Sequence, residues 1–378
     1  MKYYIIAGEA SGDLHGSNLM RALLKREPEA EIRFWGGDRM AAVCSQAVQV
    51  KHIRDLAIMG FVEVLMNAKT VLQNLEFCKQ DILDFQPDVV VMVDYPGFNL
   101  KIAKFAHSQG IKTVFYISPQ IWAWKSGRIK SMRRDLDKLC YILPSEREYF
   151  AKVDFPAGVY VGHPLLDEVE YYKQQAAEQS VDMDSKPIIA LLPGSRKQEI
   201  KQVLPAMLSV ARMHPEYQFV VSGMSLVGHS VYDKYIKDID GSVRIEYDDT
   251  YGLLSKSYAA LVCSGTATLE AALFRVPQVV LYKGNWITMV IGAFFVKLIS
   301  RLKYISLVNI TADRKIVSEL LQMDVNGSTI DSELCKITKN PELRQAMLQG
   351  YEEMITKLGN KGASDRTAEV IIKEAGKK

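Results

Sequence analysis

Short, continuous apolar runs recur along the first half of the chain, each followed by a stretch in which apolar residues repeat with helical spacing. Such runs predict strands buried on both faces of a sheet, and their alternation with helices predicts a parallel, doubly wound α/β domain. We expect strands at 2–8, 31–37, 87–94, 112–118, 138–144 and 158–164, with helices between them at 15–26, 64–85 and 99–109.

The pattern of apolar runs stops at residues 167–187, which are polar, rich in Gln and without strand character. Strand-like runs then resume at 188–193, 218–223, 243–247, 259–265 and 278–282, and the chain closes on helical patterns near 341–358 and 363–376. We therefore expect two Rossmann-like doubly wound domains that face a central cleft. Their predicted bounds are 1–166 and 188–345, with a linker at 167–187. We expect the C-terminal helices at 346–378 to pack on the first domain or, in a homodimer, on a partner chain.

Composition narrows the class of protein further. The 378 residues are 48% hydrophobic and 24% charged, and a net charge of +3 gives no argument for nucleic acid as a partner. Five scattered cysteines without a CxxC pair predict reduced thiols, a cytosolic protein and no structural zinc, and the six histidines show no metal-ligand spacing. The N-terminus does not resemble a signal peptide.

Two apolar windows, 286–296 and 56–66, are shorter than the roughly 20 residues that span a bilayer. Lys297, Arg301 and Lys303 follow the first window, and an apolar stretch with a basic flank suits a helix that lies in a membrane interface. A helix of the protein core explains each window equally well.

The turn "AGEASGDLHG" (7–16) follows the first strand and opens a helix, but it is neither a dinucleotide fingerprint nor a P-loop. Ligands bind at the first βα turn of a doubly wound domain, so Glu9, Ser11, Asp13 and His15 are candidates for substrate binding. The alternative is that Ser11 or Asp13 caps the helix.

Asp94 ends the buried run "VVVMV", where a carboxylate points into the crevice of a doubly wound sheet. Desolvation there would raise its pKa, which makes Asp94 a candidate general base; a cap of the next helix is the alternative. Trp122 and Trp124 follow a later strand and suit packing against a sugar ring or an acyl chain, although two core tryptophans are an equally simple explanation.

Two further turns lie in the second half. "LLPGSRKQEI" (191–200) carries Gly194 and Arg196, and "CSGTATLEAAL" (263–273) places Ser264, Gly265 and Thr266 at a helix start with Glu270 one turn on. Ordinary helix capping accounts for either turn alone. Two such turns in one domain favour a nucleotide diphosphate, with the carboxylate suited to a ribose diol.

The segments "AGEASGD", "VDYPGFN", "YISPQIWAW", "VGHP", "LLPGSRKQE", "CSGTATLEAAL" and "YISLVNI" together resemble the lipid-A-disaccharide synthase family over nearly the whole chain. The resemblance implies a bacterial inverting glycosyltransferase of the two-domain GT-B architecture. Such enzymes join UDP-2,3-diacylglucosamine to 2,3-diacylglucosamine 1-phosphate through a β(1→6) bond and release UDP. The step belongs to lipid A synthesis, so we expect a cytoplasmic protein bound peripherally to inner-membrane lipids.

The resemblance also implies roles for the candidate residues. Asp94 would be the catalytic base, no metal or cofactor would be required, and Arg196 with the two turns would neutralise the departing diphosphate. Val308 stands where the family usually has Pro, which predicts a looser backbone at Asn309. On the acceptor side we place Glu9, Ser11, Asp13, His15, Asn99, Trp122 and Trp124; on the nucleotide side Gly194, Ser195, Arg196, Glu199, Ser264, Gly265, Thr266, Glu270, Tyr282 and Asn309.

Three alternatives remain at this point. A UDP-sugar 2-epimerase shares the architecture and the nucleotide turns but has no use for long apolar segments. A peptidoglycan glycosyltransferase acts on a lipid-linked acceptor, but its N-terminal glycine turn differs from "GEASGD". A binding module without catalysis would keep the turns and could lack Asp94.

Overall fold

The computed structural model describes residues 1–56, 68–119, 127–176, 186–236, 243–284 and 303–377. The chain divides into two compact units, one formed by Met1–Asp167 with Asn360–Lys378 and the other by Glu168–Gly359. Each unit holds one sheet in which every strand pairing is parallel. Both units are therefore α/β structures of the predicted class.

The sheet of the first unit has seven strands in the order β3-β2-β1-β4-β5-β6-β7. Chain order reverses between β1 and β4, which makes these two neighbours the topological switch point. The strands are β1 (Lys2–Ala7), β2 (Glu31–Gly36), β3 (Val48–His52), β4 (Val89–Val93), β5 (Lys112–Tyr116), β6 (Lys138–Tyr141) and β7 (Gly158–Tyr160).

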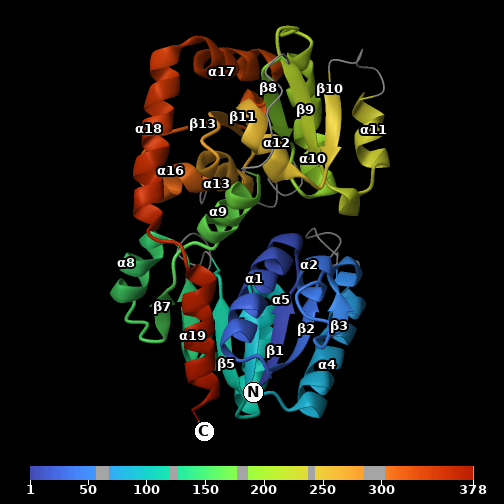
Figure 1. The fold of residues 1–378 in the computed structure, drawn as a ribbon, viewed down its shortest axis with the longest axis vertical. Coiled ribbons are helices and arrows are strands. Elements are labelled where there is room, and N and C mark those ends of the chain that lie inside the picture. Colours follow the sequence, from blue (N-terminus) through green and yellow to red (C-terminus); the bar gives the residue numbers. More distant parts are fainter. Residues whose placement is uncertain (57–67, 120–126, 177–185, 237–242, 285–302, 378) are drawn as a thin grey trace. The chain divides into compact units, whose positions relative to one another are not determined.

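Side chains alternate between the two faces of this sheet, and helices cover both. Tyr4, Ile6, Val90 and Met92 share one buried core with residues of α4 (Ala68–Phe85), α5 (Pro96–Ser108) and α7 (Arg128–Asp135). Helices α1 (Ala10–Arg26) and α19 (Ala363–Ala375) pack on each other and on the strands (Figure 1). Shorter elements complete the unit: α2 (Asp38–Ala41), η1 (Ile53–Leu56) and α8 (Pro144–Lys152).

The sheet of the second unit has six strands in the order β10-β9-β8-β11-β12-β13, and its switch point lies between β8 and β11. The strands are β8 (Ile188–Leu192), β9 (Gln218–Gly223), β10 (Val243–Tyr247), β11 (Ser257–Cys263), β12 (Gln278–Tyr282) and β13 (Ser318–Leu321).

Helices cover this sheet as well. Leu253 and Leu254 of α12 (Thr250–Lys256) and Ala271 of α13 (Thr266–Leu273) pack in one core with Ala190 and Val262 of the strands. The other helices are α9 (Leu165–Ala176), α10 (Lys197–Ala211), η2 (Ser225–Val227), α11 (Ser230–Ile236), α16 (Leu307–Ala312), η3 (Gln322–Asp324), α17 (Gly327–Lys339) and α18 (Pro341–Leu358).

Every strand predicted from an apolar run is present, but β3 and β13 were not predicted. Both are edge strands, and their sequences VQVKH and SELL contain polar residues and are mostly half-buried or exposed. An edge strand is covered on fewer sides, so it needs no continuous apolar run.

The unit boundaries differ from the predicted ones at two places. Residue 346 lies inside α18, which stays with the second unit because Tyr351 donates a hydrogen bond to the Val276 carbonyl, 3.2 Å away. The predicted linker begins inside α9. Of the C-terminal helices only α19 returns to the first unit, where Arg366 donates to the Val161 carbonyl at 2.8 Å and Arg26 pairs with Asp365.

Candidate active site

The turn after β1 and the turn after β4 are neighbours at the switch point of the first sheet. Ala7 pairs with Val93, so Gly8 and Asp94 follow the two strands side by side. A Cβ atom at Gly8 would overlap the ring of Tyr95. Gly8 is thus required for the close approach of the two turns.

Asp94 is half-buried at this edge and lies on an unusual stretch of backbone. Asp94 and Tyr95 both adopt left-handed conformations, with φ of 48° and 52°. Asn99, fully buried in α5, donates from its side-chain nitrogen to the Asp94 carbonyl at 2.7 Å. Left-handed non-glycine residues cost about 1–3 kcal/mol each and persist where the surroundings impose them, often at functional sites.

The second unit repeats this arrangement with the turns after β8 and β11. Leu192 pairs with Val262, which brings the Gly194 turn beside Ser264 and Gly265. Helix α13 begins at Thr266 with Gly265 as its N-cap residue, and no side chain caps it. Gly265 and Thr266 are exposed, so the positive end of α13 faces solvent at the carboxyl edge of the sheet.

The family model described as lipid-A-disaccharide synthetase matches residues 3–374. The chain belongs to the lipid-A-disaccharide synthetase family. A lipid-A-disaccharide synthase from Syntrophus aciditrophicus is 35% identical over 377 residues, covering 97% of this chain and 96% of the relative. The family places this member among the glycosyltransferases.

Two solved structures have the same fold. A UDP-GlcNAc 2-epimerase from Neisseria meningitidis, bound to UDP-GlcNAc, gives a TM-score of 0.63 at 13% identity and covers 99% of each chain. The glycosyltransferase of kitacinnamycin gives 0.65 at 12% identity, again with 99% coverage of each chain. At such low identity the likeness concerns the two-domain α/β architecture alone.

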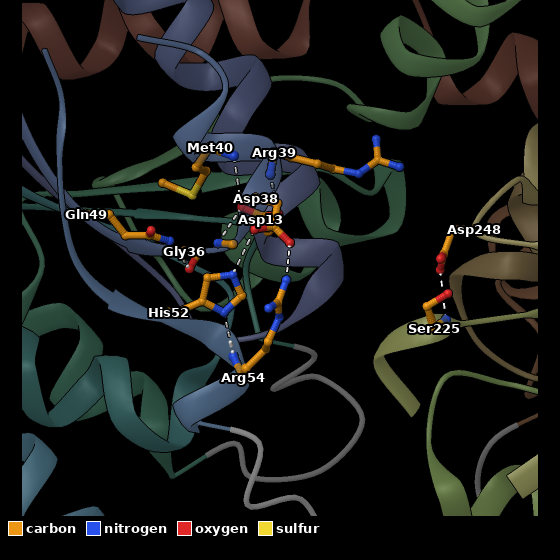
Figure 2. Close-up of polar contacts among 11 residues, drawn as sticks. Asp13, Gly36, Asp38, Arg39, Met40, Gln49, His52, Arg54, Ser225 and Asp248 are labelled. Atoms are coloured by element: carbon orange, nitrogen blue, oxygen red, sulfur yellow. Dashed lines mark hydrogen bonds and ion pairs between the residues drawn. The ribbon is translucent and has the colours of Figure 1, made fainter. Parts of the chain in front are cut away.

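In this member of the synthetase family, Asp13 binds backbone groups at the start of α2. Its buried carboxylate accepts hydrogen bonds from the backbone N–H groups of Gly37, Arg39 and Met40 at 2.6, 3.1 and 3.1 Å (Figure 2). Asp13 therefore caps α2 rather than α1, and its oxygens are engaged by backbone donors. Its role in substrate binding stays a prediction.

The other residues of the N-terminal turn differ in exposure. Glu9, the N-cap residue of α1, and Ser11 are half-buried, and the charge of Glu9 acts on Tyr95, so both remain candidates for substrate contact. His15 is buried, and burial lowers its pKa to about 4. Among the described residues none hydrogen-bonds to the His15 Nδ1 atom. Trp122 and Trp124 lie outside the described residues.

Glu199 occupies the position expected for a phosphate at the Gly194 turn. Its Oε2 atom accepts from the backbone N–H groups of Ser195 at 3.1 Å and Arg196 at 3.3 Å, and its Oε1 atom lies 3.5 Å from the Arg196 guanidinium. The backbone donors predicted for the diphosphate already bind this carboxylate. Glu199 is part of a capping box of α10, and a phosphate could use these donors only by displacing it.

Glu270 and Tyr282 lie near the ends of α13 and β12. Tyr251 donates to Glu270 at 3.2 Å, and Glu270 is half-buried one turn after Thr266. Tyr282 is half-buried at the carboxyl end of β12, where desolvation raises its pKa. Both side chains thus share the carboxyl edge of the sheet with the paired turns.

Asn309 is fully buried, and both polar atoms of its side chain are hydrogen-bonded within the second unit. Its side-chain nitrogen donates to Val317 and Glu319 at 3.0 and 2.9 Å, and its oxygen accepts from Ile316 and Val317 at 2.7 and 3.0 Å. The backbone here is held rather than loosened, since Val308 is fully buried and the Asn309 N–H donates to the Ser306 hydroxyl. Asn309 anchors the start of β13, so a direct nucleotide contact is not supported.

Sequence reasoning missed two buried groups at the edge of the first sheet. Glu146, at the start of α8, accepts from the N–H groups of Ile142 and Leu143 at 3.2 and 2.9 Å, and burial raises its pKa to about 7. His163, within the "VGHP" segment, is buried, and desolvation together with the charge of His15 lowers its pKa to about 3. The "VGHP" segment could have pointed to His163. Nothing in the sequence around Glu146, at the polar start of α8, indicated that this residue would be buried.

Proposed function

We propose that the chain joins UDP-2,3-diacylglucosamine to 2,3-diacylglucosamine 1-phosphate and releases UDP. Family membership supports a transferase that forms the lipid A disaccharide. The structural observation that carries the proposal is the pairing of the Gly194 and Ser264–Thr266 turns at the switch point of the second sheet. Such a pairing suits a nucleotide diphosphate.

The second unit holds the UDP moiety in this proposal. The uncapped start of α13 supplies backbone N–H groups, and the half-exposed Arg196 supplies the positive charge that stabilises the leaving diphosphate. Glu270 is our candidate for the ribose hydroxyls, with Tyr282 beside it. Arg196 must exchange its contact with Glu199 for one with phosphate when UDP binds.

The first unit holds the acceptor, with Asp94 as the base. Asp94 takes the proton of the acceptor 6-hydroxyl while that oxygen bonds to the anomeric carbon of the donor. The bond from that carbon to the diphosphate oxygen breaks on the opposite face, and its electron pair leaves with UDP. Attack from the opposite face inverts the anomeric centre and gives the β(1→6) bond.

We also propose peripheral binding to the inner membrane, since both substrates carry acyl chains. Among the described helices, none has both the length and the apolar character that a bilayer crossing would take. The window 286–296 and all but the first residue of the window 56–66 lie outside the described residues. This proposal therefore rests on the sequence of the two windows and on the basic flank of the first one. Replacing Phe294 and Phe295 by Ser is expected to release the protein from anionic vesicles in a sedimentation assay; unchanged sedimentation contradicts it.

The central experiment mixes the protein with both acylated sugars and analyses the products by mass spectrometry. A tetra-acyl disaccharide phosphate, formed with one UDP per disaccharide, is the expected result. A parallel reaction with UDP-GlcNAc alone tests for the 2-epimerised sugar. Epimerised product without disaccharide, or UDP binding without turnover, would overturn the proposal.

A further inference from the structure

A cluster of potential metal ligands lies in the second unit, away from the paired turns. His214 follows α10, just before β9, while Asp331 and Cys335 stand four positions apart on α17. Their ligating atoms all lie within 4.8 Å of one another. His214 thus reaches side chains that are 117 and 121 positions away in the sequence.

The distances in the cluster approach those of a tetrahedral zinc site. Zinc bonds of about 2.0–2.3 Å to N, O and S require ligand atoms roughly 3.4–3.6 Å apart. The Cys335 sulfur lies 4.0 Å from His214 Nε2 and 3.8 Å from Asp331 Oδ1, and those two atoms are 2.6 Å apart. Shifts below about 1 Å would therefore complete the geometry.

The carboxylate of Glu216 contacts the other ring nitrogen of His214. Glu216 Oε1 lies 2.9 Å from His214 Nδ1, which leaves Nε2 directed toward Asp331 and Cys335. Metal-binding histidines use their second ring nitrogen in this way, because the outer carboxylate fixes the ring orientation. Lys339 pairs with Glu216 at 3.7 Å, so the negative charge of Glu216 is partly compensated.

The donor set indicates the class of ion. One imidazole, one carboxylate and one thiol suit zinc or a similar transition metal, whereas magnesium and calcium prefer oxygen ligands alone. His214 is only 5% exposed and Cys335 is half-buried, while the Asp331 side chain is 26% exposed, so the cluster is partly shielded from water.

We propose that His214, Asp331 and Cys335 bind one zinc-type ion, with water as the fourth ligand. The cluster precedes the first residue of β9, at the amino edge of the sheet, while the Gly194 and Ser264 turns follow strands at the carboxyl edge. The ion therefore lies apart from the paired turns: it ties α17 to the segment between α10 and β9 and takes no part in sugar transfer. The spacing of the cysteines did not predict this site.

The test uses the full chain, stripped of metal with a chelator and then titrated with Zn²⁺ in a calorimeter. We expect one equivalent to bind, and a rise of the unfolding temperature in Zn²⁺. Co²⁺ in place of Zn²⁺ should give near-ultraviolet thiolate-to-metal absorption. Cys335→Ser should abolish these bands, and Glu216→Gln should weaken binding by about 10–100-fold.

Two variants separate loss of a ligand from loss of the fold. Asp331→Asn keeps a hydrogen-bonding side chain beside His214 and should still lose the site, while Cys44→Ser changes a half-buried thiol of the other unit and should leave binding intact. Absence of stoichiometric Zn²⁺ binding by the unmodified chain overturns the proposal. Binding that survives in both Asp331→Asn and Cys335→Ser overturns it equally.

Discussion

The side-chain nitrogen of Asn99 lies 2.7 Å from the carbonyl oxygen of Asp94 and holds a turn of two left-handed residues in place. Asn99→Ala removes this donor, so the turn is expected to relax and move the Asp94 carboxylate. Since a displacement of about 1 Å can cost 10²-fold in rate, kcat should fall by up to about that factor with little change in KM.

A matched control is Thr113→Val. Thr113 is equally buried and donates to the Asp135 carbonyl at 2.9 Å, but it lies near the amino end of β5. Both variants should lose about 1 kcal/mol or more of unfolding free energy, measured in urea. Only the Asn99 variant should lose turnover; equal effects on kcat would mean that Asn99 serves stability alone.

Asp94→Asn removes the proposed base with little change in shape. Turnover is expected to fall by about 10²–10⁴-fold, the usual contribution of a positioned base. Asp88→Asn is the control, because Asp88 precedes the same strand at its other end and accepts from the Lys2 N–H at 2.8 Å. Initial rates of disaccharide formation provide the measurement, and near-normal turnover of the Asp94 variant would exclude the role.

Glu199→Ala frees the N–H groups of Ser195 and Arg196 and removes a negative charge from the proposed diphosphate site. We expect UDP to bind more tightly in calorimetry, while unfolding free energy falls by about 0.5–2 kcal/mol through loss of the cap. Asn340→Ala removes the cap of α18 and should lower stability without changing UDP affinity. Weaker UDP binding by the Glu199 variant would show instead that this carboxylate orients Arg196 for the nucleotide.

Gly8→Ala should destabilise the first unit, since the new methyl group overlaps the Tyr95 ring. Overpacking of this kind costs about 1–3 kcal/mol. Gly97→Ala meets no atom within 4 Å and should be neutral or slightly stabilising in its helix. Adding Tyr95→Ala to Gly8→Ala should recover part of the loss in urea unfolding; no recovery would mean that another contact limits Gly8.

Glu146 should make the folded state less stable as pH rises. Burial raises its pKa from 4.5 to about 7, so between these values the folded chain keeps a proton that the unfolded chain releases. Its stabilising contribution is complete below pH 4.5 and is lost as pH rises through 7, by about 3 kcal/mol in all. Glu146→Gln abolishes this component, so the difference in unfolding free energy between the two proteins should change with pH in that window. A constant difference would contradict the assignment.

Local sequence patterns were enough to predict the inner strands, the turns and the class of fold. The run "VVVMV" forms β4, and the turns at Gly8, Gly194 and Gly265 fall where the chain leaves a strand. The edge strands β3 and β13 were not predicted, because a strand with one neighbour carries a weaker apolar pattern.

Which polar groups are available to a ligand depends on contacts between distant parts of the chain. Asp13 caps α2 across 24 positions, Asn309 anchors β13, and Glu199 binds the donors predicted for a phosphate. His214 meets Asp331 over 117 positions, which no spacing rule could detect. The physical reason is that a buried polar atom must find a hydrogen-bonding partner, and long-range packing of the sheet and its helices determines which partner lies within reach.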